Sequence, residues 1–122
     1  MKSAEARNSA WYQAFSKYRD NIFKSIECNF LAKVVKYDSK KHIADIQPLI
    51  NMSDGTSSAQ YLDVPVARTC YENEKAMRVG AVVVVAVLDR DSDNWDGTSA
   101  TYTPASSRTH SANDSVITSV FR

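Results

Sequence analysis

Residues 79–95 read Val-Gly-Ala-Val-Val-Val-Val-Ala-Val-Leu-Asp-Arg-Asp-Ser-Asp-Asn-Trp, and the rest of the chain is organised around them. Val82 to Leu88 is an unbroken apolar run, mostly of β-branched residues. Such side chains pack well on a pleated surface, and a run this short is typical of a strand rather than a helix. We therefore expect a central strand buried on both faces, far too short to cross a membrane.

The strand ends in a polar segment with Asp89, Asp91 and Asp93 at alternate positions. Alternating carboxylates could hold a hard cation, but an EF-hand loop needs glycine at its sixth position. No glycine falls there in the register that starts at Asp89 or in the one that starts at Asp91. We expect neither a metal ion nor a catalytic site, but ion pairs with arginines of an adjacent strand or subunit.

The bulk composition fits one domain of 122 residues with a formal net charge of +1. A net charge this small gives no global field that would mark a nucleic-acid or membrane binder. Residues 1–41 hold nine Lys and Arg against four Asp and Glu, and the remainder holds six against ten. This polarity either orients the chain in an assembly or reflects two solvated faces.

Cys28 and Cys70 are isolated, without a Cys-x-x-Cys spacing or an apolar leader sequence. This usage is typical of reduced thiols in a protein made in the cytosol. We expect both cysteines to be buried structural thiols, with a disulfide between them as the alternative.

The histidines, His42 and His110, lack a second histidine at metal-ligand spacing, so no zinc site is expected. A Ser111–His110–Asp114 triad exists only on paper, because no Gly-x-Ser-x-Gly elbow accompanies it. There is also no phosphate-binding glycine loop. The chain is therefore not expected to be an enzyme or to bind a cofactor.

Residues 1–27 are expected to form an N-terminal amphipathic helix, with Ser3 as its N-cap. Its apolar positions recur at spacings of four, three, four and four: Trp11, Phe15, Tyr18, Ile22 and Ile26. Two arrangements stay open. The helix either covers its own β core or packs against a neighbouring subunit or hub protein.

Residues 28–122 change to a period of two, which is typical of strands. Strands are expected at 29–37, 42–50, 61–68, 82–88 and 115–121, with a tight turn at 38–41 and exposed loops at 51–60 and 96–107. No βαβ rhythm is present. The chain is therefore expected to be mainly β, a five-stranded OB-fold-like Greek-key barrel behind the helix. An open β-sandwich fragment is the alternative.

OB barrels often bind single-stranded nucleic acid through a basic groove lined with aromatic side chains. Here the basic residues concentrate in the N-terminal helix and in residues 33–41, the second of which has only Phe30 and Tyr37 beside it. The later strands are acidic. Nucleic acid is not an expected partner, although single-strand binding is retained as the alternative function.

Four segments, in order, resemble the N-terminal OB-fold domain of phage baseplate central-spike (membrane-piercing) proteins. Two are Ala-Asp-Ile-Gln-Pro-Leu-Ile at 44–50 and Leu-Asp-Val-Pro-Val at 62–66. The third is the valine strand that runs into Asp-Arg-Asp-Ser-Asp-Asn-Trp at 89–95, similar to the family's Arg-Asp-x-Asp-Asn-Trp. The fourth, Ser-Arg-Thr-His-Ser-Ala-Asn-Asp-Ser-Val-Ile at 107–117, is similar to its Arg-His-Ser/Asp-x-x-Asp-Ala-hydrophobic motif. The match covers about residues 29–121.

The resemblance implies a homotrimeric, non-enzymatic component of a contractile-tail baseplate, assembled in the host cytoplasm and carried in the virion. It would be a central spike or hub adaptor that caps the tail tube and helps to penetrate the cell envelope, without stable membrane insertion. Its neighbours would be tail hub or tube proteins above and a separate spike tip or baseplate protein below. The structural or interface candidates are Trp11, Phe15, Ile22, Asp89, Arg90, Asp91, Asp93, Asn94, Trp95, Arg108, His110 and Asp114.

Two features depart from the family. Nothing up to Arg122 resembles the β-helical needle of larger members, so we expect a short member or one whose tip is a separate chain. Residues 70–77 are charged where relatives are rich in Gly and Phe. Within the motifs, we expect Arg90 or Arg108 to pair with one of the aspartates, and Trp95 to pack over the end of the barrel.

Overall fold

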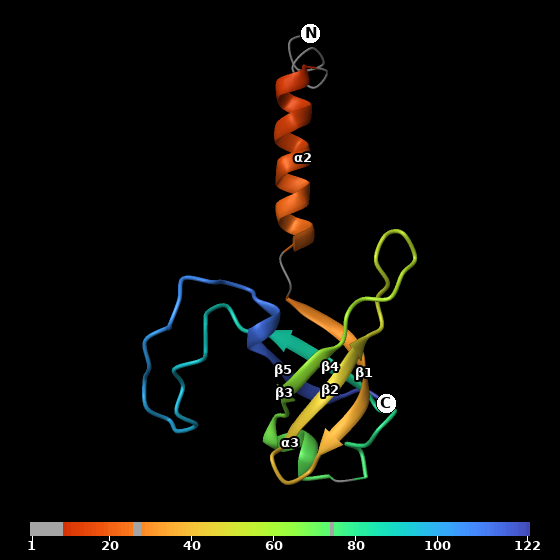
Figure 1. Ribbon diagram of the computed structural model, residues 1–122, viewed down its shortest axis with the longest axis vertical. Helices are drawn as coiled ribbons and strands as arrows, with labels where there is room; N and C mark the ends of the chain where they lie inside the picture. The colour runs from red at the N-terminus through yellow and green to blue at the C-terminus, as the bar shows by residue number, and fades with distance from the viewer. Residues whose placement is uncertain (1–8, 26–27, 74) are drawn as a thin grey trace.

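The computed structural model describes residues 9–25, 28–73 and 75–122 (Figure 1). Its elements in chain order are α2 (Ala10–Ser25), β1 (Asn29–Asp38), β2 (Ile43–Pro48), β3 (Tyr61–Pro65), α3 (Arg68–Tyr71), β4 (Val82–Val87), the 3-10 turn η1 (Ala112–Asp114) and β5 (Ser115–Val120). The expected strands are all present. Each matches its predicted range to within a few residues.

The five strands form one antiparallel sheet in the order β3-β2-β1-β4-β5. The register shifts at Val34/Lys36, at Ala44/Ile46 and at Val84/Val85. Such bulges increase the local twist of a strand, and here they curl the sheet into a half-barrel (Figure 1). The mainly β, OB-fold-like prediction is confirmed.

The two edge strands meet where the sheet curls round. Val66, just after β3, forms a parallel bridge with Ile117 of β5. The Ala67 amide donates to the Ile117 carbonyl at 2.9 Å. This contact between segments about fifty residues apart in sequence turns the curled sheet into a barrel around one core.

The valine strand faces the core on one side only. Val83, Val85 and Val87 are buried, whereas Val82, Val84 and Ala86 on the outer side are half-buried. The prediction that this strand is buried on both faces is therefore wrong. A continuous apolar run does not reveal whether a second layer covers the outer face.

Residues 70–77 contribute to the core despite their charged sequence. Cys70 of α3 and Met77 are both buried, and burial raises the pKa of the Cys70 thiol. The prediction of a buried thiol is correct for Cys70 and wrong for Cys28, which is exposed and, like Cys70, is a free cysteine. Cys28 lies in the connection before β1, where the barrel does not cover it.

Helix α2 begins after Ser9, whose hydroxyl accepts from the Tyr12 amide at 3.1 Å. Ser3, the expected N-cap, lies outside the described residues. The helix stands clear of the barrel (Figure 1), and its side chains from residue 10 to residue 22 are exposed apart from half-buried Ser16. The alternative in which this helix covers its own β core is thus wrong for the described residues. Within them, no helix has the length and apolarity to span a membrane.

Candidate functional site

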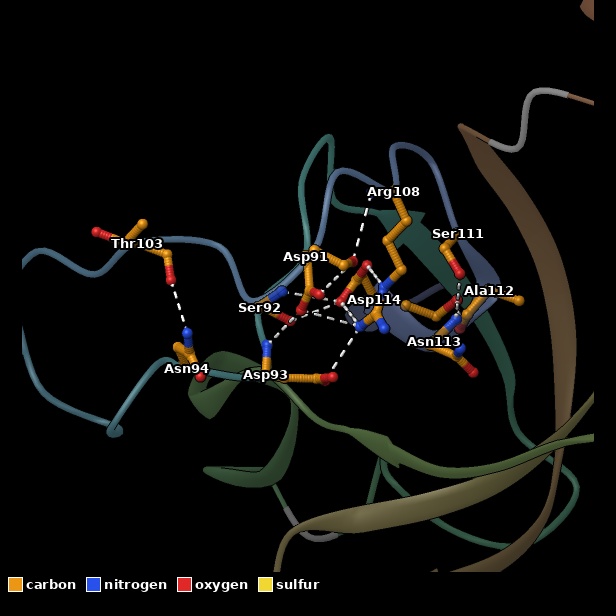
Figure 2. A network of polar contacts seen from close by, with 12 residues as sticks. Asp91, Ser92, Asp93, Asn94, Thr103, Arg108, Ser111, Ala112, Asn113 and Asp114 are labelled. Carbon is orange, nitrogen blue, oxygen red and sulfur yellow. Dashed lines mark hydrogen bonds and ion pairs between the residues drawn. The ribbon is translucent and has the colours of Figure 1, made fainter.

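The polar residues at the two ends of the β4–β5 connection meet around Arg108 (Figure 2). One guanidinium nitrogen, Nη2, lies 3.1 Å from Asp91 Oδ1, 3.0 Å from Asp93 Oδ1 and 2.9 Å from Asp114 Oδ1. Nε also donates to Asp114 Oδ2 at 3.0 Å, which makes that pair bidentate. We call Arg108 and these three aspartates the Arg108 cluster.

The cluster is buried on the side facing the barrel. The side chains of Asp91 and Asp114 are 1% and 0% exposed, that of Arg108 is 27% exposed and that of Asp93 is 61% exposed. A buried carboxylate is tolerated only when it is paired and hydrogen-bonded. Arg108 therefore places its single positive charge between the two buried carboxylates and offsets part of their charge.

Further hydrogen bonds satisfy the remaining carboxylate oxygens. Asp91 accepts from the Ser106 hydroxyl at 2.6 Å and from the Asp93 amide at 2.8 Å. Asp114 accepts from the amide and the hydroxyl of Ser92 at 3.0 and 2.9 Å. In each of these contacts an N–H or O–H group donates to a carboxylate oxygen, which favours the ionised form of the aspartate. Most of them also connect the start of the long loop with its end.

Local backbone structure presents Asp114 to the cluster. Asp114 closes the 3-10 turn η1, where the Ser111 hydroxyl accepts from the Asn113 amide at 3.3 Å. The Leu88 amide donates to the Asp114 carbonyl at 2.9 Å, just beyond β4. A bridge between Arg90 and Thr109 closes the neck of the loop. The cluster is thus held at the point where both strands leave the barrel.

These contacts favour the charged forms of the buried aspartates. Hydrogen bonds from Arg108, reinforced by those from Ser92, lower the pKa of Asp114 from 3.8 to about 2, although burial opposes the shift. The Ser106 hydroxyl and the Asp93 amide lower the pKa of Asp91 as well. The carboxylates in turn raise the pKa of Arg108. Asp91, Arg108 and Asp114 are therefore ionised at neutral pH.

Acid is expected to weaken the folded state through Asp114. An unfolded aspartate takes up its proton near pH 3.8 and folded Asp114 only near pH 2, so stability is lost as the pH falls through this window. The free energy of unfolding of wild type should exceed that of Asp114→Asn at pH 6. The difference should narrow between pH 4 and pH 2, as measured by urea unfolding. A difference that is constant down to pH 2 would contradict this role.

The other motif residues lie around this centre in less buried positions. The prediction that Arg90 or Arg108 pairs with an aspartate is confirmed for Arg108. Asn94 donates to the Thr103 carbonyl at 2.9 Å and thereby ties the outer loop together (Figure 2). His110 has φ +48° and places Nε2 3.6 Å from Asp89 Oδ1.

Trp95 does not cap the barrel. Its side chain is 53% exposed, and its indole nitrogen donates to the Thr98 carbonyl at 2.7 Å within the same loop. The prediction that it packs over the barrel end is therefore wrong. The long loop between β4 and η1, which carries Trp95, extends away from the barrel (Figure 1).

The geometry bears on metal binding and on catalysis. Among the described residues, carboxylate oxygens of Asp91, Asp93 and Asp114 lie within 4.8 Å of one another. At this distance the three could bind one cation together. The Arg108 guanidinium already contacts all three and is itself that cation. Ser111, His110 and Asp114 do not form a catalytic triad. Asp114 pairs with Arg108, and the Ser111 hydroxyl accepts a hydrogen bond from the Asn113 amide.

Ser92 and Ser106 were missed by sequence reasoning. Both donate to the buried carboxylates, but serines are common in the surrounding segment and nothing distinguishes these two.

Comparison of the chain with protein-family models and with curated proteins found no match.

Proposed function

We propose that this protein is a structural, non-enzymatic component of a contractile-tail baseplate and acts as a homotrimer. It would form a central spike or a hub adaptor that caps the tail tube. In that position it would help the tail to penetrate the cell envelope. The proposal follows the resemblance of four ordered sequence motifs, and the contacts of these motifs now add a physical argument.

The observation that carries the proposal is that the motif residues form ion pairs with one another. Arg108 contacts Asp91, Asp93 and Asp114 at once, so the motif residues from the two ends of the loop are bound to one another. A cluster of this kind fixes the base of a long loop to a closed barrel. A tail component under load during contraction needs this kind of rigidity more than it needs an open cleft.

Single-stranded nucleic-acid binding is the alternative, and charge distribution argues against it. Such binding needs an uninterrupted basic groove. The hollow beside the β1–β2 hairpin brings Lys36 and Lys41 together with Asp38, Asp45 and Asp63. The neighbouring carboxylates offset the lysines there.

Light scattering of the purified chain tests the proposal. A homotrimer should give three times the chain mass of 13.6 kDa at micromolar concentration. Fluorescence anisotropy with a labelled single-stranded oligonucleotide should show no salt-dependent binding. A monomer at every concentration, or tight binding that weakens steeply with salt, would contradict the proposal and favour the alternative.

A further inference from the structure

Helix α2 carries an apolar stripe that its own barrel leaves exposed. Trp11, Phe15, Tyr18 and Ile22 are 73%, 56%, 67% and 41% exposed, and the rings of Trp11 and Phe15 contact each other with centroids 4.4 Å apart. Aromatic side chains dominate the energetics of interfaces when they are covered. A stripe of this kind on a helix that projects from the domain is an interaction surface (Figure 1).

The spacing of the stripe is compatible with association between copies of this helix. Intervals of four, three and four residues are the steps between alternating a and d positions of helices that wind around each other. Phe15 and Ile22 then occupy a positions, and Trp11 and Tyr18 occupy d positions. Charged Lys17 and Asp20 fall at c and f, facing away from the seam.

The exposed area is large enough for self-association. An aromatic side chain buries roughly 150–250 Å² when covered, so the stripe with neighbouring Tyr12 exposes on the order of 500 Å² per helix. Two copies would thus cover about 1,000 Å², the size at which a specific interface begins.

Flanking charges permit a parallel arrangement. The g positions beside the seam are Ala14 and Asn21, and Arg19 at e therefore faces no like charge across a parallel seam. The base of the helix leads to β1, whose Leu31 is also partly exposed on the outer face of the barrel. In a parallel arrangement, the outer faces of the barrels near Leu31 would all lie at the same end of the assembly.

Helix stability points the same way. Isolated helices shorter than about 12–15 residues are marginal in water even when rich in alanine. Helix α2, with 16 residues, is only slightly longer, and its aromatic residues have lower helix propensity than alanine. Without barrel packing, the helix needs another surface to hold it.

We infer that copies of this chain associate through α2 as parallel, in-register helices whose seam is Trp11, Phe15, Tyr18 and Ile22. The inference deepens the homotrimer of the proposed function by naming the surface that holds it together. It does not depend on the number of copies being three.

Substitution of the seam tests the inference by light scattering. Phe15→Asp and Tyr18→Asp should each reduce the assembly to a single chain of 13.6 kDa and lower the helical circular dichroism signal at 222 nm. The matched control Gln13→Asp places the same charge at an outward f position and should leave the assembly intact. Urea unfolding should show the barrel unchanged in all three variants, since α2 does not pack on it.

Cross-linking tests the orientation. In a Cys28→Ser background, Tyr18→Cys should give disulfide-linked dimers under mild oxidation, because parallel in-register helices bring identical seam positions together. Lys17→Cys should not. Cross-linking of Lys17→Cys alone, or of neither variant, would overturn the parallel seam.

The outcomes separate this inference from the proposed function. A wild-type dimer that Phe15→Asp dissolves supports the inference and contradicts the trimer. A trimer that survives Phe15→Asp supports the proposed function and overturns the inference. A wild-type monomer at every concentration overturns both.

Discussion

Replacing Arg108 with alanine is expected to lower the free energy of unfolding by about 3–5 kcal/mol at pH 7. The change removes the cation that pairs with Asp91 and Asp114, whose side chains are almost completely buried. Breaking a buried pair costs more than the pair itself contributes, because an uncompensated charge stays in the interior. Urea unfolding followed by circular dichroism measures the effect.

Two further variants show that the effect arises from buried charge. Arg108→Lys should recover only part of the loss, since an ammonium group cannot reproduce the bidentate contact with Asp114. Arg68→Ala removes an exposed arginine paired with Glu72 and should change stability by no more than about 1 kcal/mol. Equal effects of Arg68→Ala and Arg108→Ala would contradict the role given to the Arg108 cluster.

Replacing Ile117 with alanine is expected to cost about 2–5 kcal/mol. Ile117 is fully buried, pairs with Val85 and bridges to Val66 at the closure of the barrel. The shortened side chain leaves a cavity between two backbone partners, Val85 on one side and Val66 on the other. Because both partners fix the backbone, the surrounding residues cannot easily move in to fill the cavity.

The control for this prediction lies two residues away on the same strand. Ser119→Ala changes an exposed side chain of β5 and should alter the free energy of unfolding by no more than about 0.5 kcal/mol. The measurement is again urea unfolding. A loss below about 1 kcal/mol for Ile117→Ala would mean that the β3–β5 contact contributes little to the fold.

Local patterns predicted most of the barrel because alternation and turn chemistry act over a few residues. The turn at 38–41 is an example, in which the Asp38 carboxylate accepts from the amides of Lys40 and Lys41. The closure between Val66 and Ile117 could not be read in this way. It depends on three bulges whose positions carry no sequence signal of their own.

The residue types of the Arg108 cluster could be predicted from the sequence, but its contacts could be predicted only in part. An excess of aspartates near two arginines indicated ion pairing, but whether Arg90 or Arg108 supplies the charge depends on the path of the loop between them. Arg90 forms the backbone bridge at the neck, and its side chain is exposed. Trp95 shows the opposite case, because an aromatic residue after a strand suggests burial while the loop carries it outward.

The apolar stripe of α2 was visible in the sequence, but its environment was not. A helical period of apolar residues predicts a covered face without saying which molecule covers it. The position of the helix away from the barrel (Figure 1) shows that its own core does not cover the stripe.

The most direct test of the proposed function is the amount and position of this chain in purified contractile-tail particles from its source. Quantitative mass spectrometry should find three copies per particle. Antibody labelling in electron micrographs should place them on the axis at the baseplate end of the tube. Complete particles that contain none of the chain would contradict the account.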